Sequence, residues 1–156
     1  MLKQLLLVFL LCLVLSSCGI STPKSVILDE DSINSKISFN IEETTFNYKL
    51  SYRDNSFCFA SVEGTAPIDF LIEDGTLFLL NRDIKYPINS DSINPIPMII
   101  VKALDMSVGR KISPDSDGEY KLYGTLREGE YVLLLSNKGK PKLLSIENLN
   151  LNVEFS

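Results

Sequence analysis

The chain has 156 residues, enough for one domain, and its net charge of −5 argues against a nucleic-acid partner. It contains no histidine, which excludes Ser–His and Cys–His catalysis as well as imidazole metal sites. Because we find no catalytic motif, no cofactor motif and no metal-ligand pattern, we predict that the protein is not an enzyme.

The first 17 residues have the pattern of a secretory signal peptide. Lys3 supplies the positive start, and an almost purely apolar run follows over residues 5–15. This run is shorter than the roughly 20 apolar residues of a membrane span. The segment Leu15–Cys18 (LSSC) resembles a bacterial lipobox, in which the cysteine receives a diacylglyceryl group and becomes the first mature residue. The alternatives are an ordinary signal peptide or an anchor that stays attached.

A diacylated Cys18 predicts attachment to the extracytoplasmic face of a bacterial membrane, either the cell membrane or the outer membrane. Under this interpretation residues 18–33 are the acylated cysteine and a short polar tether, and residues 34–156 form a single β-rich domain. Cys12 leaves with the signal peptide and Cys18 takes the lipid. The remaining Cys58 therefore has no partner for an intramolecular disulfide, and its aromatic neighbours indicate a buried, inert thiol.

Alternation of apolar and polar residues predicts strands along most of the domain. The first half contains predicted strands over residues 36–43, 45–53 and 56–64, and a hairpin over residues 68–81. Asp74-Gly75 gives this hairpin its turn signal. Residues 83–88 form a further short extended segment, which Pro87 confines to a sheet edge or a strand end.

The apolar period changes over residues 91–108, which contain the predicted helix. Pro97 suits a first helical turn, and Gly109 is a natural stop. Strands are predicted again afterwards, in four segments: residues 118–126, 130–137, 141–147 and 149–155. Between the helix and these strands, Asp115 and Asp117 precede a glycine, which indicates a surface turn rather than a metal-binding loop.

These elements predict a mainly β (α+β) fold: a curved antiparallel meander of about eight or nine strands. Short turns join neighbouring strands, so the sheet has one apolar face that needs a cover. One helix of about a dozen residues cannot cover so many strands. We therefore expect a half-barrel with the helix packed on its concave face, enclosing a cavity for a lipid or another apolar ligand. The alternative is a fully packed core without a cavity.

The end of the chain, YGTLREGEYVLLLSNKGKPKLLSIENLNLNVEF, resembles the C-terminal half of the lipoprotein-carrier fold. That superfamily includes the periplasmic lipoprotein carrier, its outer-membrane receptor and mycobacterial lipid-carrying lipoproteins. The resemblance rests on four consecutive features: a strand, a turn of the type D/N-x-G-x-P, an L-x-I strand and a final V-x-F strand. The matching residues are Asn137, Gly139, Pro141, Leu144, Ile146, Val153 and Phe155. The resemblance implies a sheet whose apolar inner face shelters acyl chains.

If the resemblance holds, the candidate ligand-binding residues are inward-facing aromatics and two helix residues: Phe46, Tyr48, Phe57, Phe70, Met98 and Leu104. Plain core packing is the alternative role for each of them. The first functional hypothesis is a lipid-anchored, non-catalytic protein that binds or carries lipid or acyl chains. The second is a lipid-anchored interaction or structural module that contacts another envelope protein and has no ligand cavity.

Overall fold

The computed structural model describes residues 24–62, 68–81, 84–88 and 95–156, so the predicted signal peptide and Cys18 lie outside the described residues. The strands are β1 (Val26–Ile27), β2 (Ser35–Ile41), β3 (Thr44–Arg53), β4 (Ser56–Ser61), β5 (Asp69–Glu73), β6 (Thr76–Asn81), β7 (Ile84–Ile88), β8 (Lys111–Ile112), β9 (Tyr120–Leu126), β10 (Gly129–Leu135), β11 (Pro141–Ile146) and β12 (Leu151–Phe155). The helices are α2 (Ile96–Asp105) and the 3₁₀ helices η1 (Glu30–Ile33) and η2 (Glu147–Leu149).

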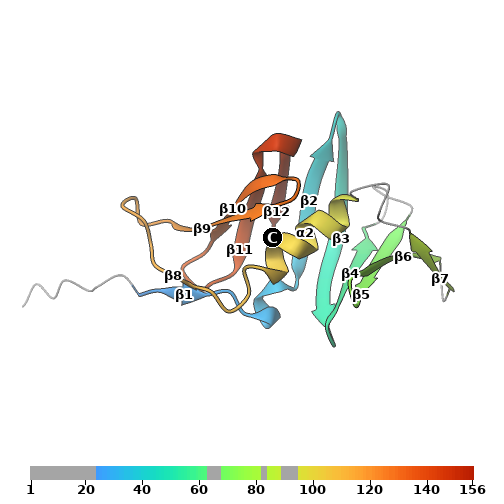
Figure 1. The fold of residues 1–156 in the computed structure, drawn as a ribbon, viewed down its shortest axis with the longest axis horizontal. Coiled ribbons are helices and arrows are strands. Elements are labelled where there is room, and N and C mark those ends of the chain that lie inside the picture. Colours follow the sequence, from blue (N-terminus) through green and yellow to red (C-terminus); the bar gives the residue numbers. More distant parts are fainter. Residues whose placement is uncertain (1–23, 63–67, 82–83, 89–94) are drawn as a thin grey trace, which may run out of the picture.

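The predicted fold class is confirmed: the protein is mainly β, with a large curved antiparallel sheet and one α-helix among the described residues (Figure 1). The sheet has ten strands in the order β7-β6-β5-β4-β3-β2-β12-β11-β10-β9, and β1 and β8 form a separate two-stranded sheet. It thus consists of two meanders, β2–β7 and β9–β12, joined by the antiparallel pairing of β2 with β12. The sheet does not close into a barrel, because β7 and β9 remain as separate edges.

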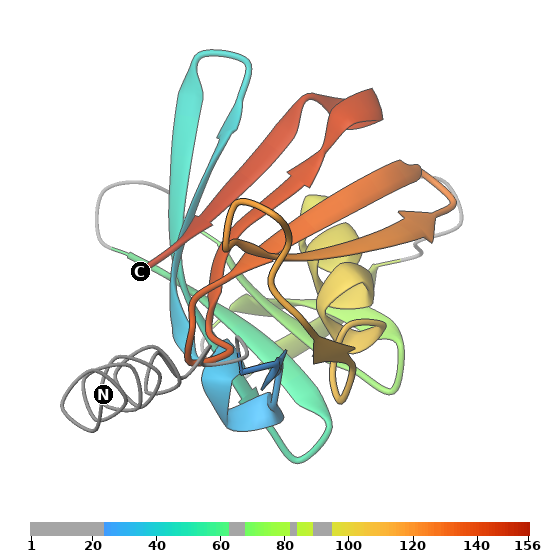
Figure 2. The same ribbon diagram turned by 90° about the vertical axis from the view of Figure 1, so that its left-hand side faces the viewer.

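Helix α2 lies on the concave face of this sheet. The sheet has a C-shaped section in Figure 2, and the helix lies at the open side of the C. Its predicted position is confirmed, with Pro95 as N-cap and Pro97 within the first turn. Seven of its ten residues are buried, among them Ile100, Ala103 and Leu104, which are fully covered. The helix is therefore held by apolar burial on most of its surface.

The apolar alternation of each strand places one set of side chains against α2. Register pairs these inner residues across the sheet, for example Leu50 with Phe59 and Leu144 with Val153, and all four are fully buried. Residues in between, such as Lys49, point to the outer face and are exposed. The core therefore lies between the inner face of the sheet and α2, as expected for a sheet with one buried face.

Of the predicted tether over residues 18–33, the structure describes residues 24–33, and this part packs on the β-rich domain. Val26 pairs with Ile112 in the small sheet, and both Leu28 and Ile33 are fully buried in the core. Asp29 caps η1 by accepting a hydrogen bond from the Ser32 N–H at 2.8 Å. A two-residue strand and a single 3₁₀ turn are too short to show a hydrophobic period. The segment therefore looks polar in the sequence, although its few apolar residues are buried in the core.

A buried hydrogen-bond chain fixes α2 to the sheet. The Ser107 hydroxyl donates to the Ala103 carbonyl at 2.6 Å and lies 3.1 Å from the Tyr131 hydroxyl. Tyr131 is opposite Gly124 on the neighbouring strand β9, and a Cβ added at Gly124 would fall on the Tyr131 ring. The absence of a side chain at Gly124 therefore lets the ring lie across the strand and reach the helix.

We expect Gly124→Ala to lower the free energy of unfolding by about 1–3 kcal/mol, because the new methyl group displaces the Tyr131 ring and breaks its contact with Ser107. The measurement is a denaturant unfolding curve of each variant. Thr125→Ala, an exposed neighbour on the same strand, is the control and should change stability by less than about 0.5 kcal/mol. Equal stability of the two variants would contradict the proposed role of Gly124.

Candidate functional site

Three of the predicted ligand-binding residues lie in one row of aromatic rings on the inner face. The Phe46 ring stacks on Phe39 with ring centroids 5.7 Å apart, and Phe39 stacks on Tyr48 at 5.9 Å. Tyr48 in turn contacts Phe70 at 5.9 Å and the edge of Phe59 at 6.1 Å. The row connects strands β2 to β5, so its rings contribute to the cohesion of the sheet.

The other three predicted residues lie elsewhere in the same core. Phe57 pairs with Tyr52, with ring centroids 4.6 Å apart, whereas Met98 and Leu104 are buried on α2. Tyr48, Phe57, Met98 and Leu104 each expose 5% or less of their surface. The structure therefore brings all six residues to the inner side of the sheet, where most of them are covered by core neighbours.

Grooves lined by described residues lie outside this core, and none of the six predicted residues lines the three of them described below. The rim groove, of about 450 Å³, lies where the β2–β3 turn, the start of α2 and the start of β12 meet; it is lined by Asn40, Ile41, Glu42, Ile96, Ile99, Leu149, Asn150 and Leu151. Ile41 and Leu149 are 40% and 43% exposed, whereas Ile99 and Leu151 are 2% exposed. The rim groove therefore has a buried apolar floor that continues into the core, and its apolar walls are accessible.

Two residues with left-handed backbone shape the rim groove. Glu42 in the β2–β3 turn has φ 54°, and Asn150, which ends η2, has φ 47°. Asparagine adopts this conformation more easily than most residues. At this point the chain turns from η2 into β12, with exposed Leu149 before the turn and buried Leu151 after it. The sequence analysis missed the site because it treated both leucines as parts of one alternating strand.

The basic groove is the largest of the three, at about 950 Å³, and lies on the outer face of β2–β5; its charged lining residues are Lys36, Lys49, Arg53, Asp54, Glu73 and Lys85. Cys58 also lines it. Burial raises the pKa of the Cys58 thiol and the charge of Asp69 raises it further, whereas a hydrogen bond with Ser51 lowers it. The net shift is upward, so the thiol is a poor nucleophile at neutral pH.

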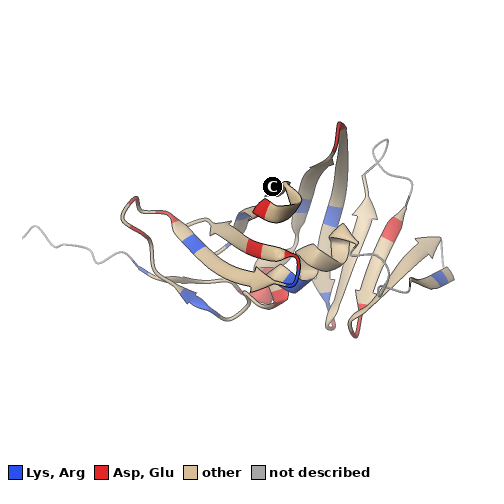
Figure 3. Cartoon of the chain, turned by 45° about the horizontal axis from the view of Figure 1, so that its top comes forward, with Lys and Arg blue, Asp and Glu red and all other residues tan. Residues whose placement is uncertain are grey.

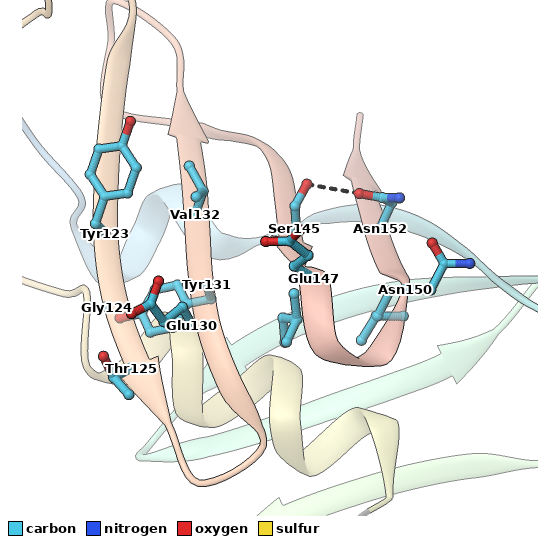
Figure 4. A pocket seen from close by; sticks show the side chains of 12 residues that line it. Tyr123, Gly124, Thr125, Glu130, Tyr131, Val132, Ser145, Glu147, Asn150 and Asn152 are labelled. Atoms are coloured by element: carbon cyan, nitrogen blue, oxygen red, sulfur yellow. Dashed lines mark hydrogen bonds between the residues drawn. The ribbon is translucent and has the colours of Figure 1, made fainter.

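The third groove, of about 580 Å³, lies on the outer face of β9–β12 (Figure 4). Figure 4 shows Tyr123, Glu130 and Glu147 around it, and the Ser145 hydroxyl donating to the Asn152 side chain at 2.8 Å. Tyr123 is 64% exposed. The groove combines polar and apolar side chains, and its two carboxylates lie on different elements, Glu130 on β10 and Glu147 on η2, which suits a solvated surface.

The Asp115–Asp117 turn is held together by internal bonds. The Asp115 carboxylate accepts the backbone N–H groups of Glu119 at 2.9 Å and Asp117 at 3.0 Å, and it lies 3.1 Å from the Lys121 ammonium. The bond from the Glu119 N–H and the contact with Lys121 lower the pKa of the Asp115 carboxyl. These bonds give Asp115 a structural role in the predicted surface turn.

Comparison with known protein families, with curated proteins and with solved structures found no match. Within the described ranges 24–62, 68–81, 84–88 and 95–156, no helix has both the length and the apolar character needed to cross a membrane.

The alkylation rate of Cys58 should be half-maximal at a higher pH than that of a free cysteine, because the folded protein keeps the thiol protonated. The folded protein is treated with iodoacetamide at pH values from 7 to 10. The alkylation rate at each pH is measured by mass spectrometry of the digested peptide that contains Cys58. Urea-unfolded protein is the control. The unfolded chain loses this proton at a lower pH, so the folded state should also lose stability above the pKa of a free thiol. A half-maximal rate at or below that of the unfolded control would contradict the shift.

Proposed function

We propose that this protein is a non-catalytic binding protein for an apolar ligand such as a lipid or an acyl chain. In this proposal a diacylated Cys18 attaches it to the extracytoplasmic face of a bacterial membrane. The resemblance of its C-terminal strands to lipoprotein carriers supports the same class of ligand. The observation that carries the proposal is the rim groove.

The composition of the rim groove supports an apolar ligand. Its volume of about 450 Å³ lies within the roughly 300–1,000 Å³ of small-molecule sites. Aliphatic side chains form its walls and floor, and a few polar groups, Asn40, Glu42 and Asn150, lie among them. Such a mixture is typical of a ligand site, in which apolar contacts supply affinity and a few polar contacts fix orientation.

Ligand binding would remove apolar surface from water. Ile41 and Leu149 are the accessible side chains, and an acyl chain laid between them would also contact the floor at Ile99 and Leu151. Burial stabilises by about 25 cal/mol per Å² of apolar surface, or about 0.8 kcal/mol per methylene group. The freedom that a ligand loses on binding offsets part of this gain, so measurable binding needs a long acyl chain rather than a few methylene groups.

The second candidate function is a protein-interaction module of the cell envelope, and one observation favours it. At the β7 edge of the sheet, Ile84 and Tyr86 are 55% and 49% exposed. Leu71 and Phe78, on the outer face of the adjoining strands, are only half-buried. An edge with apolar residues on both faces suits a protein partner, although Pro87 removes one N–H donor from that edge.

Native mass spectrometry of the full chain purified from bacterial membranes tests the first proposal. We expect a stoichiometric acyl-chain adduct that survives dilution, in addition to the covalent lipid on the cysteine. A protein mass without any adduct, together with an unchanged melting temperature after addition of fatty acid, would contradict the proposal and favour the interaction module.

The double variant Ile41→Gln/Leu149→Gln should weaken fatty-acid binding about tenfold or more, since each substitution removes roughly 1 kcal/mol of apolar contact. Both side chains are partly exposed, so the fold should tolerate the change. The measurement is a fluorescent fatty-acid titration. Met106→Gln, a 53% exposed residue at the other end of α2, is the control and should bind normally. Equal affinities of the double variant and the control would place the ligand elsewhere.

A further inference from the structure

The basic groove concentrates positive charge on an acidic protein. Lys36, Lys49, Arg53 and Lys85 line it, against the two carboxylates of Asp54 and Glu73, while the whole chain has net charge −5. Figure 3 shows basic bands along β2 and β3, whereas the turn that joins these strands is acidic. The cations are therefore grouped on strands, within one groove, rather than scattered over turns.

Three of these cations are available for a ligand. Lys85 pairs with Glu73 at 2.9 Å and also lies 5.8 Å from the centre of the Phe78 ring. Among the described residues, no ion pair joins Lys36, Lys49 or Arg53 to a carboxylate. The positive charge of these three side chains is thus not neutralised inside that part of the chain.

The strand register places two of these lysines directly opposite each other. Lys36 on β2 is the cross-strand partner of Lys49 on β3, and both side chains are exposed on the outer face. Like charges directly opposite each other in an antiparallel pair destabilise the sheet. The backbone of Lys36 is held in this register by the hydrogen bonds of its N–H and its carbonyl to Ser156, each 2.9 Å long. A local cost of this kind is expected at functional sites.

The chemistry of the three cations suits a phosphate group. The planar guanidinium of Arg53 can donate two parallel hydrogen bonds to phosphate oxygens, and the lysine ammonium groups add compact charge. A phosphate placed between Lys36 and Lys49 would convert their repulsion into two attractions. At about 950 Å³ the groove is also larger than a phosphate ion, so it leaves room for the group that carries the phosphate. We infer that the basic groove binds a phosphate-bearing ligand.

A lipid headgroup and a free phosphate compound both carry the group that this groove suits. The groove begins at Asn34–Lys36, directly after η1, and extends over β3 and β5 to Lys85 on β7, whereas the rim groove lies at the other end of β2. The membrane to which the proposed lipid anchor attaches the protein supplies headgroups as one source. This choice of source, unlike the charge cluster itself, rests on the lipid anchor of the proposed function.

Titration calorimetry of the full chain in a neutral detergent tests the inference. The probes are inorganic phosphate, a soluble short-chain phosphatidylglycerol, and the diacylglycerol with the same acyl chains, which has no phosphate. The two lipids differ only in the phosphoglycerol headgroup, so equal binding of both reports acyl-chain contacts at the rim groove, whereas a preference for phosphatidylglycerol reports the basic groove. We expect at least a tenfold preference for phosphatidylglycerol that weakens as salt is added.

The variant Lys36→Gln/Lys49→Gln/Arg53→Gln should abolish this preference. The matched control is Lys138→Gln/Lys140→Gln/Arg127→Gln, which removes the same residue types and the same charge from exposed turns outside the groove. The control should keep the preference. Lys49→Gln alone should bind phosphate probes more weakly while raising the melting temperature, because it relieves the repulsion from Lys36. This single variant keeps the test valid if the triple variant folds poorly.

Binding of inorganic phosphate with comparable affinity would support the groove and identify a free phosphate compound as sufficient. Binding of phosphatidylglycerol without inorganic phosphate would support the groove and identify the headgroup. Failure of every phosphate probe, or an equal loss of preference in the matched control, would overturn the inference. Both of these failures leave fatty-acid binding at the rim groove unaffected, so they are distinguishable from failure of the proposed function.

Discussion

The antiparallel pairing of β2 with β12 is the constraint on which the rest of the structure depends. Val153, Glu154 and Phe155 pair with Phe39, Ser38 and Ile37, and this register unites two meanders that are each local in the chain. The pairing puts the beginning and the end of the domain at the middle of the sheet. The edges β7 and β9, which the chain connects directly through α2 and β8, are consequently its most distant strands.

The position of α2 follows from this arrangement. A connection between opposite edges has to pass over one face of the sheet, and the apolar inner face is the one that gains from cover. The helix is apolar around most of its circumference, and Tyr131 and Ser107 fix its C-terminal end with a buried hydrogen bond. Its N-terminal end has no side-chain cap, and that end forms one wall of the rim groove.

Much of the fold could be predicted from the sequence, because strands with one buried face carry their period in the residues themselves. Asp74-Gly75 marked its hairpin correctly, with both residues at positive φ, and Pro97 marked the start of the helix. The packing of Leu28 and Ile33 could not be predicted, since elements of two to four residues have no period. The predicted aromatics were placed on the correct face, although they pack against one another in the core.

The grooves were beyond sequence analysis for a different reason: they depend on which strands become neighbours and in what register. In the sequence, Lys36 and Lys49 look like ordinary solvent-facing residues of two separate strands. Only the register shows that they lie directly opposite each other. Leu149 and Ile41 are far apart in the chain and meet only because β12 pairs with β2. One pairing therefore creates an apolar groove at one end of β2 and helps to fix a cationic groove at the other. β2 has seven residues, so the two grooves are separated by about 20 Å along the strand.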